Sequence, residues 1–268
     1  MANSAWSSRG YIERRITELR GTISRTLVIV QFTDNSVIDS FVGRKLRVAT
    51  DLSVECKLEK HIDIDEVIAL KFVRQLVLEN PDAGIIVQLP LPTGWNTESF
   101  LELIADNDVD VLSPSVYSAW IERHYAGLPP VVYAVKTSLG ECGITLADLI
   151  SRGIVVCGSG KLVGKPVQDW LRMHNIRYSV IDITTAPDER AQLLKDADII
   201  ISGTGASHSI VPTDVSDGVV LIDCGTSSDA GVLQGDIHPD CVTKAQFMTR
   251  TPGGIGPLTV LGVFENMK

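Results

Sequence analysis

The sequence lacks the features of membrane and secreted proteins. No apolar run approaches the roughly 20 residues that span a bilayer. The first ten residues, Met1 to Gly10, are polar and contain no apolar stretch of signal-peptide length. We therefore expect a cytoplasmic protein without a membrane partner.

Basic charge is also scarce. Lysine and arginine number 24 against 33 aspartates and glutamates, which gives a formal net charge of −9. Nucleic acids and anionic membrane surfaces attract proteins through basic fields. We therefore expect no nucleic-acid partner, and an anionic small molecule would need a locally basic pocket.

Paired cysteines are absent as well. The five cysteines are an odd number, widely spaced, with no CxxC motif. This pattern favours neither a disulfide framework nor a metal or redox centre. We interpret them as free thiols in a reducing compartment and expect no metal site.

What is present is a regular alternation of strand-like and helix-like segments over 268 residues, enough for two domains. Short apolar runs predict buried strands, and stretches of helical spacing separate them. This order predicts an α/β fold with parallel sheets. The expected strands are 26–31, 54–58, 84–89, 153–157, 177–181, 198–202 and 218–223, and the expected helices are 34–50, 64–79, 134–151, 167–174, 188–196 and 256–268.

A glycine-rich turn follows the expected strand 153–157. Gly158, Gly160 and Gly164 have the spacing G-x-G-x-x-x-G, one residue longer than the usual dinucleotide fingerprint. Such glycines let the backbone approach a pyrophosphate at a helix N-terminus. The alternative interpretation is a purely structural strand-to-helix turn.

Asp182 ends the next expected strand. An acid at this place commonly accepts hydrogen bonds from the adenosine ribose and repels a 2′-phosphate, which favours NAD over NADP. The alternative is a solvated aspartate that caps a loop.

Four further segments carry a resemblance to a known family. They are Val87–Pro92 (VQLPLP), Asp108–Asp110 (DVD), Leu162–Pro166 (LVGKP) and Thr251–Thr259 (TPGGIGPLT). In this order they resemble motifs of the bifunctional methylenetetrahydrofolate dehydrogenase/cyclohydrolase family. The resemblance covers nearly the whole chain.

The resemblance implies two domains with small-molecule chemistry in the cleft between them. We expect an α/β catalytic, folate-binding domain at 1–127, completed by a C-terminal helix at 256–268. A Rossmann-like NAD(P)-binding domain would occupy 128–255. The implied reactions are oxidation of methylenetetrahydrofolate with NAD(P) and hydrolysis of the methenyl product to formyltetrahydrofolate. The implied partners are tetrahydrofolate derivatives and a second copy in a homodimer.

The resemblance also assigns three catalytic roles. Lys45 matches the lysine that steers or deprotonates water, Gln88 the glutamine that orients this lysine, and Asp110 the acid that binds the pterin edge. Without the resemblance, Lys45 could belong to a solvated basic face with Arg44 and Arg47. Gln88 could simply end a strand, and the two aspartates of DVD could be turn residues.

The remaining candidate residues fall into two groups. The candidates for substrate binding are Phe41, Leu89, Pro90, Pro252, Gly253 and Gly254. The candidates for cofactor binding are Gly158, Ser159, Gly160, Val163, Gly164, Asp182 and Thr226.

The sequence departs from the family pattern at four places. Phe41 replaces the tyrosine of Y-x-x-x-K and lacks its hydroxyl, which weakens the expectation of hydrolysis. Ser159 replaces an arginine that typically holds phosphate near the adenosine, although Lys161 or Lys165 could bind it instead. Val111 replaces a glycine, and Pro130–Tyr133 replaces a PCTP segment.

Three hypotheses therefore stand: an enzyme with both activities, a dehydrogenase with little cyclohydrolase activity, and a catalytically reduced protein that binds folate or nucleotide. The Lys45, Gln88 and Asp110 set favours the first of these.

Overall fold

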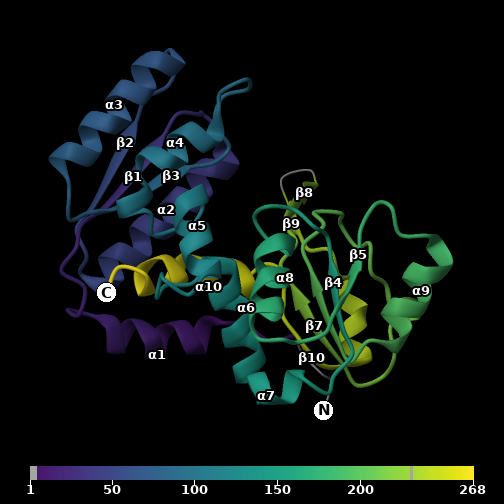
Figure 1. Ribbon diagram of the computed structural model, residues 1–268. Helices are drawn as coiled ribbons and strands as arrows, with labels where there is room; N and C mark the ends of the chain where they lie inside the picture. Colours follow the sequence, from purple (N-terminus) through teal and green to yellow (C-terminus); the bar gives the residue numbers. More distant parts are fainter. Residues whose placement is uncertain (1–4, 230–231) are drawn as a thin grey trace. The chain divides into compact units, whose positions relative to one another are not determined.

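The computed structural model describes residues 5–229 and 232–268, which form two compact units (Figure 1). The folate-type unit, named for the domain expected there, contains Ile12–Pro130 and Val260–Lys268. The Rossmann unit contains Met1–Tyr11 and Val131–Thr259.

The folate-type unit is built on a parallel three-stranded sheet with the order β2-β1-β3. Its strands are β1 (Leu27–Gln31), β2 (Cys56–Lys60) and β3 (Gly84–Gln88). Every residue of the central strand β1 is buried, whereas the edge strand β2 is mostly exposed. The register pairs Gln31 with both Lys60 and Gln88, so the three strands end at one level.

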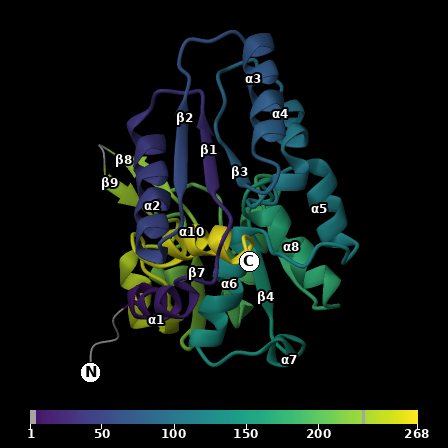
Figure 2. The same ribbon diagram turned by 90° about the vertical axis from the view of Figure 1, so that its left-hand side faces the viewer.

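Helices cover both faces of this sheet. The helix α2 (Ser36–Leu52) lies on one face, and α3 (Glu66–Glu79) and α4 (Thr97–Leu103) lie on the other (Figure 2). Buried side chains of β1 and β3 pack with those of α3 and α4 in one cluster. The unit also contains the 3-10 turn η1 (Ala105–Asn107) and α5 (Pro114–Ile121).

The Rossmann unit is built on a parallel five-stranded sheet with the order β10-β7-β6-β4-β5. Its strands are β4 (Ile154–Cys157), β5 (Ser179–Ile181), β6 (Ile199–Ser202), β7 (Val219–Asp223) and β10 (Ala245–Met248). The helices α6 (Pro130–Glu141) and α8 (Gly164–Met173) lie on one face of the sheet and α9 (Pro187–Asp196) on the other (Figure 1). This is the doubly wound arrangement that the sequence predicts.

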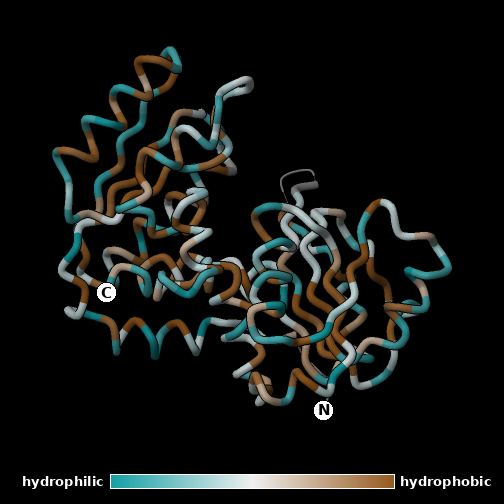
Figure 3. The backbone as a smooth tube through the Cα atoms, viewed as in Figure 1, coloured by the Kyte–Doolittle hydropathy of each residue, from teal (hydrophilic) through white to brown (hydrophobic). Residues whose placement is uncertain are grey.

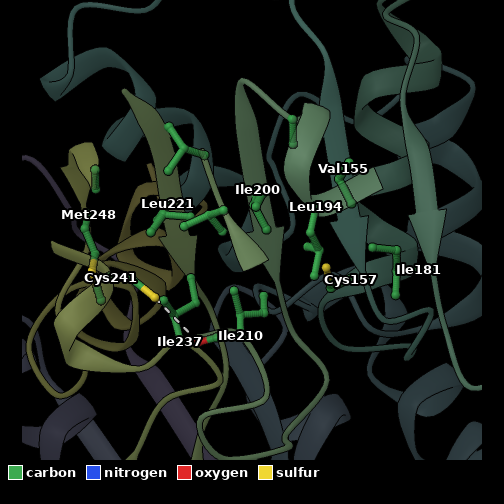
Figure 4. Close-up of a cluster of buried hydrophobic side chains, with 14 residues drawn as sticks. Val155, Cys157, Ile181, Leu194, Ile200, Ile210, Leu221, Ile237, Cys241 and Met248 are labelled. Carbon is green, nitrogen blue, oxygen red and sulfur yellow. Dashed lines mark hydrogen bonds between the residues drawn. The ribbon is translucent and has the colours of Figure 1, made fainter. Parts of the chain in front are cut away.

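The core of the Rossmann unit explains why the apolar runs form its strands. Hydrophobic residues, brown in Figure 3, run along these strands. Val155, Ile200 and Leu221 from three neighbouring strands pack with Leu194 of α9 (Figure 4). Burying each such side chain stabilises the fold by about 1.5–3 kcal/mol.

Smaller elements complete the Rossmann unit. They are α7 (Leu146–Leu149), η2 (Pro212–Asp214), the hairpin strands β8 (Ser227–Asp229) and β9 (Val232–Gln234), and η3 (Pro239–Thr243). No helix in the described parts of the chain has both the length and the apolar character that a membrane crossing needs.

The predicted parallel α/β fold is confirmed, but the single helix expected at 134–151 is wrong. The helix α6 ends at Glu141, and α7 begins only at Leu146. Gly143 adopts a φ of +79°, and the N–H of Ile144 bonds the carbonyl of Leu139 at 2.9 Å, which closes the helix end. A capping box of Thr145 and Asp148 then starts α7.

The predicted domain limits differ from the two units at the N-terminus. Residues before Ile12 cluster with the Rossmann unit rather than with the folate-type unit. The reason is backbone pairing beside β10: the N–H of Trp6 bonds Met248 at 2.6 Å, and the N–H of Arg250 bonds Trp6 at 3.0 Å. The helix α10 (Ile255–Glu265) contains the division after Thr259, so the expected 256–268 segment is shared between the units.

Candidate active site

Lys45 lies on the apolar face of α2. Val42 and Ala49, one turn before and after it, are 2% and 1% exposed, and Lys45 itself is only 8% exposed. Arg47, by contrast, is exposed. The alternative of a solvated basic face is therefore wrong for Lys45.

Two side chains from separate segments of the chain approach the Lys45 amine. Its Nζ donates a hydrogen bond to Oε1 of Gln88 at 2.8 Å, and Oδ2 of Asp110 lies 4.0 Å away. Nε2 of Gln88 donates to the carbonyl of Leu89 at 2.9 Å. This second bond fixes the amide so that its oxygen faces the lysine.

The surroundings of the amine favour its neutral form. Burial lowers the pKa of Lys45, while the negative charge of Asp110 and the Cys56 thiol act in the opposite direction. A lysine with a lowered pKa is available as a proton acceptor closer to neutral pH than an exposed one.

Asp110 sits in a short segment that is organised by Asp108. The Asp108 carboxylate accepts the backbone N–H groups of Asp110 and Val111 on one oxygen and those of Leu112 and Ser113 on the other, at 2.7 to 2.9 Å. Burial raises the pKa of Asp108, and the backbone N–H donors act in the opposite direction. The sequence identified Asp108 only as part of a motif; no local pattern indicates such a set of contacts.

Phe41 lies one helical turn before Lys45 and is half-buried. The guanidinium of Arg44 lies 5.3 Å from the centre of its ring. A cation over an aromatic face is attractive, so Arg44 competes with any ligand that would stack on that face.

The other substrate-binding candidates are divided between the units. Leu89 and Pro90 directly follow Gln88, and the hydroxyl of Thr33 donates to the carbonyl of Pro90 at 2.7 Å. Pro252, Gly253 and Gly254 belong to the Rossmann unit. There the carbonyl of Gly253 accepts the N–H of Ser8 at 3.0 Å.

The glycine-rich turn connects β4 to α8, as predicted. Gly158 has a φ of +99°, and a Cβ on Gly164 would overlap the carbonyl oxygen of Gly158. A Cβ on Gly160, however, would meet nothing within 4 Å. Two of the glycines thus allow the turn to form, whereas Gly160 leaves open space beside it.

The polar candidates for cofactor binding are exposed. Ser159 lies within the turn, and Val163 immediately precedes α8 without a side-chain cap. Asp182 directly follows β5, where its Oδ1 accepts from the N–H and the hydroxyl of Thr184 at 2.8 and 2.7 Å. These bonds lower the pKa of Asp182. Thr226 is exposed between β7 and β8.

No cluster of three or more histidine, cysteine, aspartate or glutamate side chains within residues 5–229 and 232–268 is placed to hold a metal ion. The arrangement at Lys45 is therefore one of an amine, an amide and a carboxylate. Such groups can bind a polar heterocycle and move a proton.

Known proteins are similar to this chain in sequence. The model of the tetrahydrofolate dehydrogenase/cyclohydrolase NAD(P)-binding domain matches residues 131–268. Bifunctional protein FolD of Mycoplasma genitalium is 31% identical over 247 residues, covering 90% of this chain and 85% of that protein. FolD of Lactobacillus acidophilus is 32% identical over 242 residues, covering 88% and 83%.

Solved structures share the fold. The bifunctional FolD methylenetetrahydrofolate dehydrogenase/cyclohydrolase from Campylobacter jejuni has a TM-score of 0.86 at 25% identity, covering 96% of this chain and 93% of that one. The Trypanosoma brucei enzyme, complexed with NADP and an inhibitor, has a TM-score of 0.90 at 23% identity, covering 100% and 97%. The chain therefore belongs to the tetrahydrofolate dehydrogenase/cyclohydrolase family.

Proposed function

We propose that this protein oxidises methylenetetrahydrofolate with NAD(P) and hydrolyses the methenyl product to formyltetrahydrofolate. The observation that carries the proposal is the buried Lys45 amine, bonded to Gln88 and 4.0 Å from Asp110. The relatives named bifunctional FolD support the same pair of activities.

In the hydrolytic step the neutral amine of Lys45 accepts a proton from water as the water oxygen bonds the methenyl carbon. As the five-membered ring opens, the resulting ammonium returns its proton to the ring nitrogen that leaves, and the hydroxyl proton of the adduct is released to solvent as the formyl carbonyl forms. Gln88 holds the amine in place through its Oε1. Asp110 accepts hydrogen bonds from N–H donors of the pterin.

The glycine-rich turn fits a dinucleotide. It joins the carboxyl end of the interior strand β4 to a helix, and the space beside Gly160 is open to an approaching pyrophosphate. Gly158, Gly160 and Gly164 would hold this group through the backbone. The chemistry that bound NAD(P) would supply there is acceptance of a hydride from the methylene carbon.

NAD is the proposed preference over NADP. Asp182 places a negative charge at the end of β5, and Ser159 offers no cation for a 2′-phosphate. Lys165 is an unsuitable substitute because its Nζ already pairs with the buried carboxylate of Asp169 at 2.6 Å.

A dehydrogenase with weak hydrolysis is the second candidate. Phe41 has no hydroxyl to hold a water molecule, and the guanidinium of Arg44 lies over its ring. If this candidate is correct, Phe41→Tyr should speed hydrolysis several-fold and leave oxidation unchanged.

The test is a two-step assay of the purified protein. Methylenetetrahydrofolate is mixed with NAD or NADP, and the absorbances of reduced cofactor and of methenyltetrahydrofolate are followed together. We expect reduced cofactor with a higher kcat/KM for NAD, and methenyltetrahydrofolate that decays faster than without protein. Binding of both ligands without any turnover would instead support a catalytically reduced family member.

We also propose a cytoplasmic homodimer. All five cysteines are free, as expected in a reducing compartment. The short strand β5 lies at an edge of its sheet, and the adjoining Ile183 is fully exposed. Light scattering should give twice the mass of the chain, and a monomer at micromolar concentration would contradict the dimer.

A further inference from the structure

Asp108 is a buried acid that the proposed chemistry leaves without a role. It is 3% exposed and directly follows η1. Its carboxylate accepts four backbone N–H groups, two on each oxygen. An ionised carboxylate has about four lone-pair sites, so this set uses its full accepting capacity.

The backbone around Asp108 is fixed to the strand that carries Gln88. Asp108 forms a parallel bridge with Ile85 of β3. The carbonyl of the next residue, Val109, accepts Nδ2 of Asn266 at 2.9 Å. These contacts hold the backbone at Asp108 in place. Its carboxylate can therefore fix the positions of the residues that follow.

Those following residues contain a strained position. Val111 has a φ of +57°, a left-handed conformation that is rare for a β-branched residue, and its side chain is fully buried. Its N–H is one of the four that Asp108 accepts, at 2.9 Å. The carboxylate thus opposes the tendency of Val111 to return to an ordinary conformation.

Asp110 directly precedes Val111 and follows Asp108 by two residues. Its own N–H bonds Oδ1 of Asp108 at 2.9 Å, and its Oδ2 lies 4.0 Å from the Lys45 amine. A rotation of the backbone at Val111 would therefore move the carboxylate that faces Lys45.

We propose that Asp108 is a positioning residue, which holds the strained turn at Val111 and so keeps the Asp110 carboxylate beside the Lys45 amine. The catalytic part of this inference rests on the proposed function of Lys45 and Asp110. The structural part rests only on the contacts of Asp108.

The test is Asp108→Asn, whose amide nitrogen would face two N–H donors instead of accepting them. We expect kcat for hydrolysis to fall at least tenfold. The matched control is Asp65→Asn, which removes the same charge from the same unit. The Asp65 side chain accepts the N–H of Val67 at the start of α3, a role that asparagine fills equally well. This control should retain wild-type rates.

A second readout does not require turnover. The lysines are reductively methylated with ¹³C-formaldehyde. The NMR signal of Lys45 is assigned as the one that is missing from the spectrum of Lys45→Met. Asp110 and Cys56 are the groups that raise the pKa of Lys45. Asp108→Asn should lower the pKa of Lys45, in the same direction as Asp110→Asn. This measurement tests the structural part of the proposal even if the proposed activities are absent.

A compensating change separates positioning from general instability. Glycine adopts the left-handed conformation without strain, so Asp108→Asn combined with Val111→Gly should regain part of the lost kcat. It should also fold if Asp108→Asn alone does not. A folded Asp108→Asn protein with wild-type kcat and Lys45 titration would overturn the proposal. So would a double variant that fails to fold or recovers nothing.

Discussion

The two candidate binding regions differ in the parts of the chain that form them. Around Lys45, side chains from separate segments approach one another: Lys45 is only 8% exposed, and Gln88 and Asp110 are half-buried. At the glycine-rich turn, the backbone forms the region, and the polar side chains Ser159 and Asp182 are exposed.

This difference explains one departure from the family pattern, the serine at position 159. The amine, amide and carboxylate depend on each other through direct contacts, and all three are present. At the turn, the glycines that the backbone requires are kept, whereas an exposed residue such as Ser159 changes without disturbing the fold. The catalytic side chains and the residues that set cofactor choice can thus change independently, and three experiments test this independence.

The largest effect is expected for Lys45→Met. Methionine fills a similar volume but cannot accept a proton, so hydrolysis should slow by about 10² to 10⁴-fold. The free energy of unfolding should hold or rise because a buried amine is lost. The control is Arg47→Met on the exposed face of the same helix. Equal hydrolysis rates in both variants would remove Lys45 from the mechanism.

The second prediction compares two glycines of one turn. In Gly164→Ala the new Cβ overlaps the backbone of Gly158, so both stability and cofactor affinity should fall, the stability by about 1–3 kcal/mol. In Gly160→Ala the Cβ enters open space, so stability should hold while NAD affinity drops about tenfold. Calorimetry and fluorescence titration measure the two quantities. Unchanged affinity in Gly160→Ala would show that the pyrophosphate binds elsewhere.

The third prediction concerns cofactor choice. Ser159→Arg introduces a cation that can bond a 2′-phosphate, and a charge-assisted bond of about 1.5–3 kcal/mol corresponds to a 10- to 100-fold gain in kcat/KM for NADP. The rate with NAD should change little. Ser151→Arg adds the same charge at an exposed site away from the turn. An equal gain from that variant would mean that charge alone, not position, attracts NADP.

The smallest effect is expected from a carboxyl group outside both regions. Burial raises the pKa of Asp223, at the end of β7, to about 6. The folded state then binds a proton that the unfolded state, with an aspartate pKa of about 3.9, releases. The free energy of unfolding should therefore fall by about 2 to 3 kcal/mol as the pH rises from about 4 to 6.

Urea titrations across this pH range measure the fall in stability. Asp223→Asn should abolish the pH dependence, whereas the exposed Asp188→Asn should retain it. Identical slopes in the two variants would assign the effect to another group.

The sequence predicted the buried strands well because their signal is local. The apolar runs that became β1, β3, β4, β6 and β7 were placed within one or two residues. The strand β10 and the helix α1 (Arg9–Leu19) were not predicted. Only Leu19 is buried in α1, and β10 is a short, partly polar edge strand, so neither has a distinct apolar pattern.

The candidate site shows a similar limit. Motifs indicated Lys45, Gln88 and Asp110, but their meeting depends on the packing of α2 against the sheet. The four contacts of Asp108 and the φ of Val111 depend on a backbone path that no residue pattern specifies. Gly143, which adopts a left-handed conformation, could have indicated the end of a helix. The apolar residues on both sides of it have helical spacing, so the sequence predicted one continuous helix instead.

The most direct test of the central claim is the pH dependence of methenyltetrahydrofolate hydrolysis. If the neutral Lys45 amine accepts the proton, the rate should rise with pH and level off below the ordinary lysine pKa of about 10.4. In Asp110→Asn the rise should move to lower pH, because the carboxylate that stabilises the ammonium is gone. A midpoint that is the same in both proteins would contradict the account.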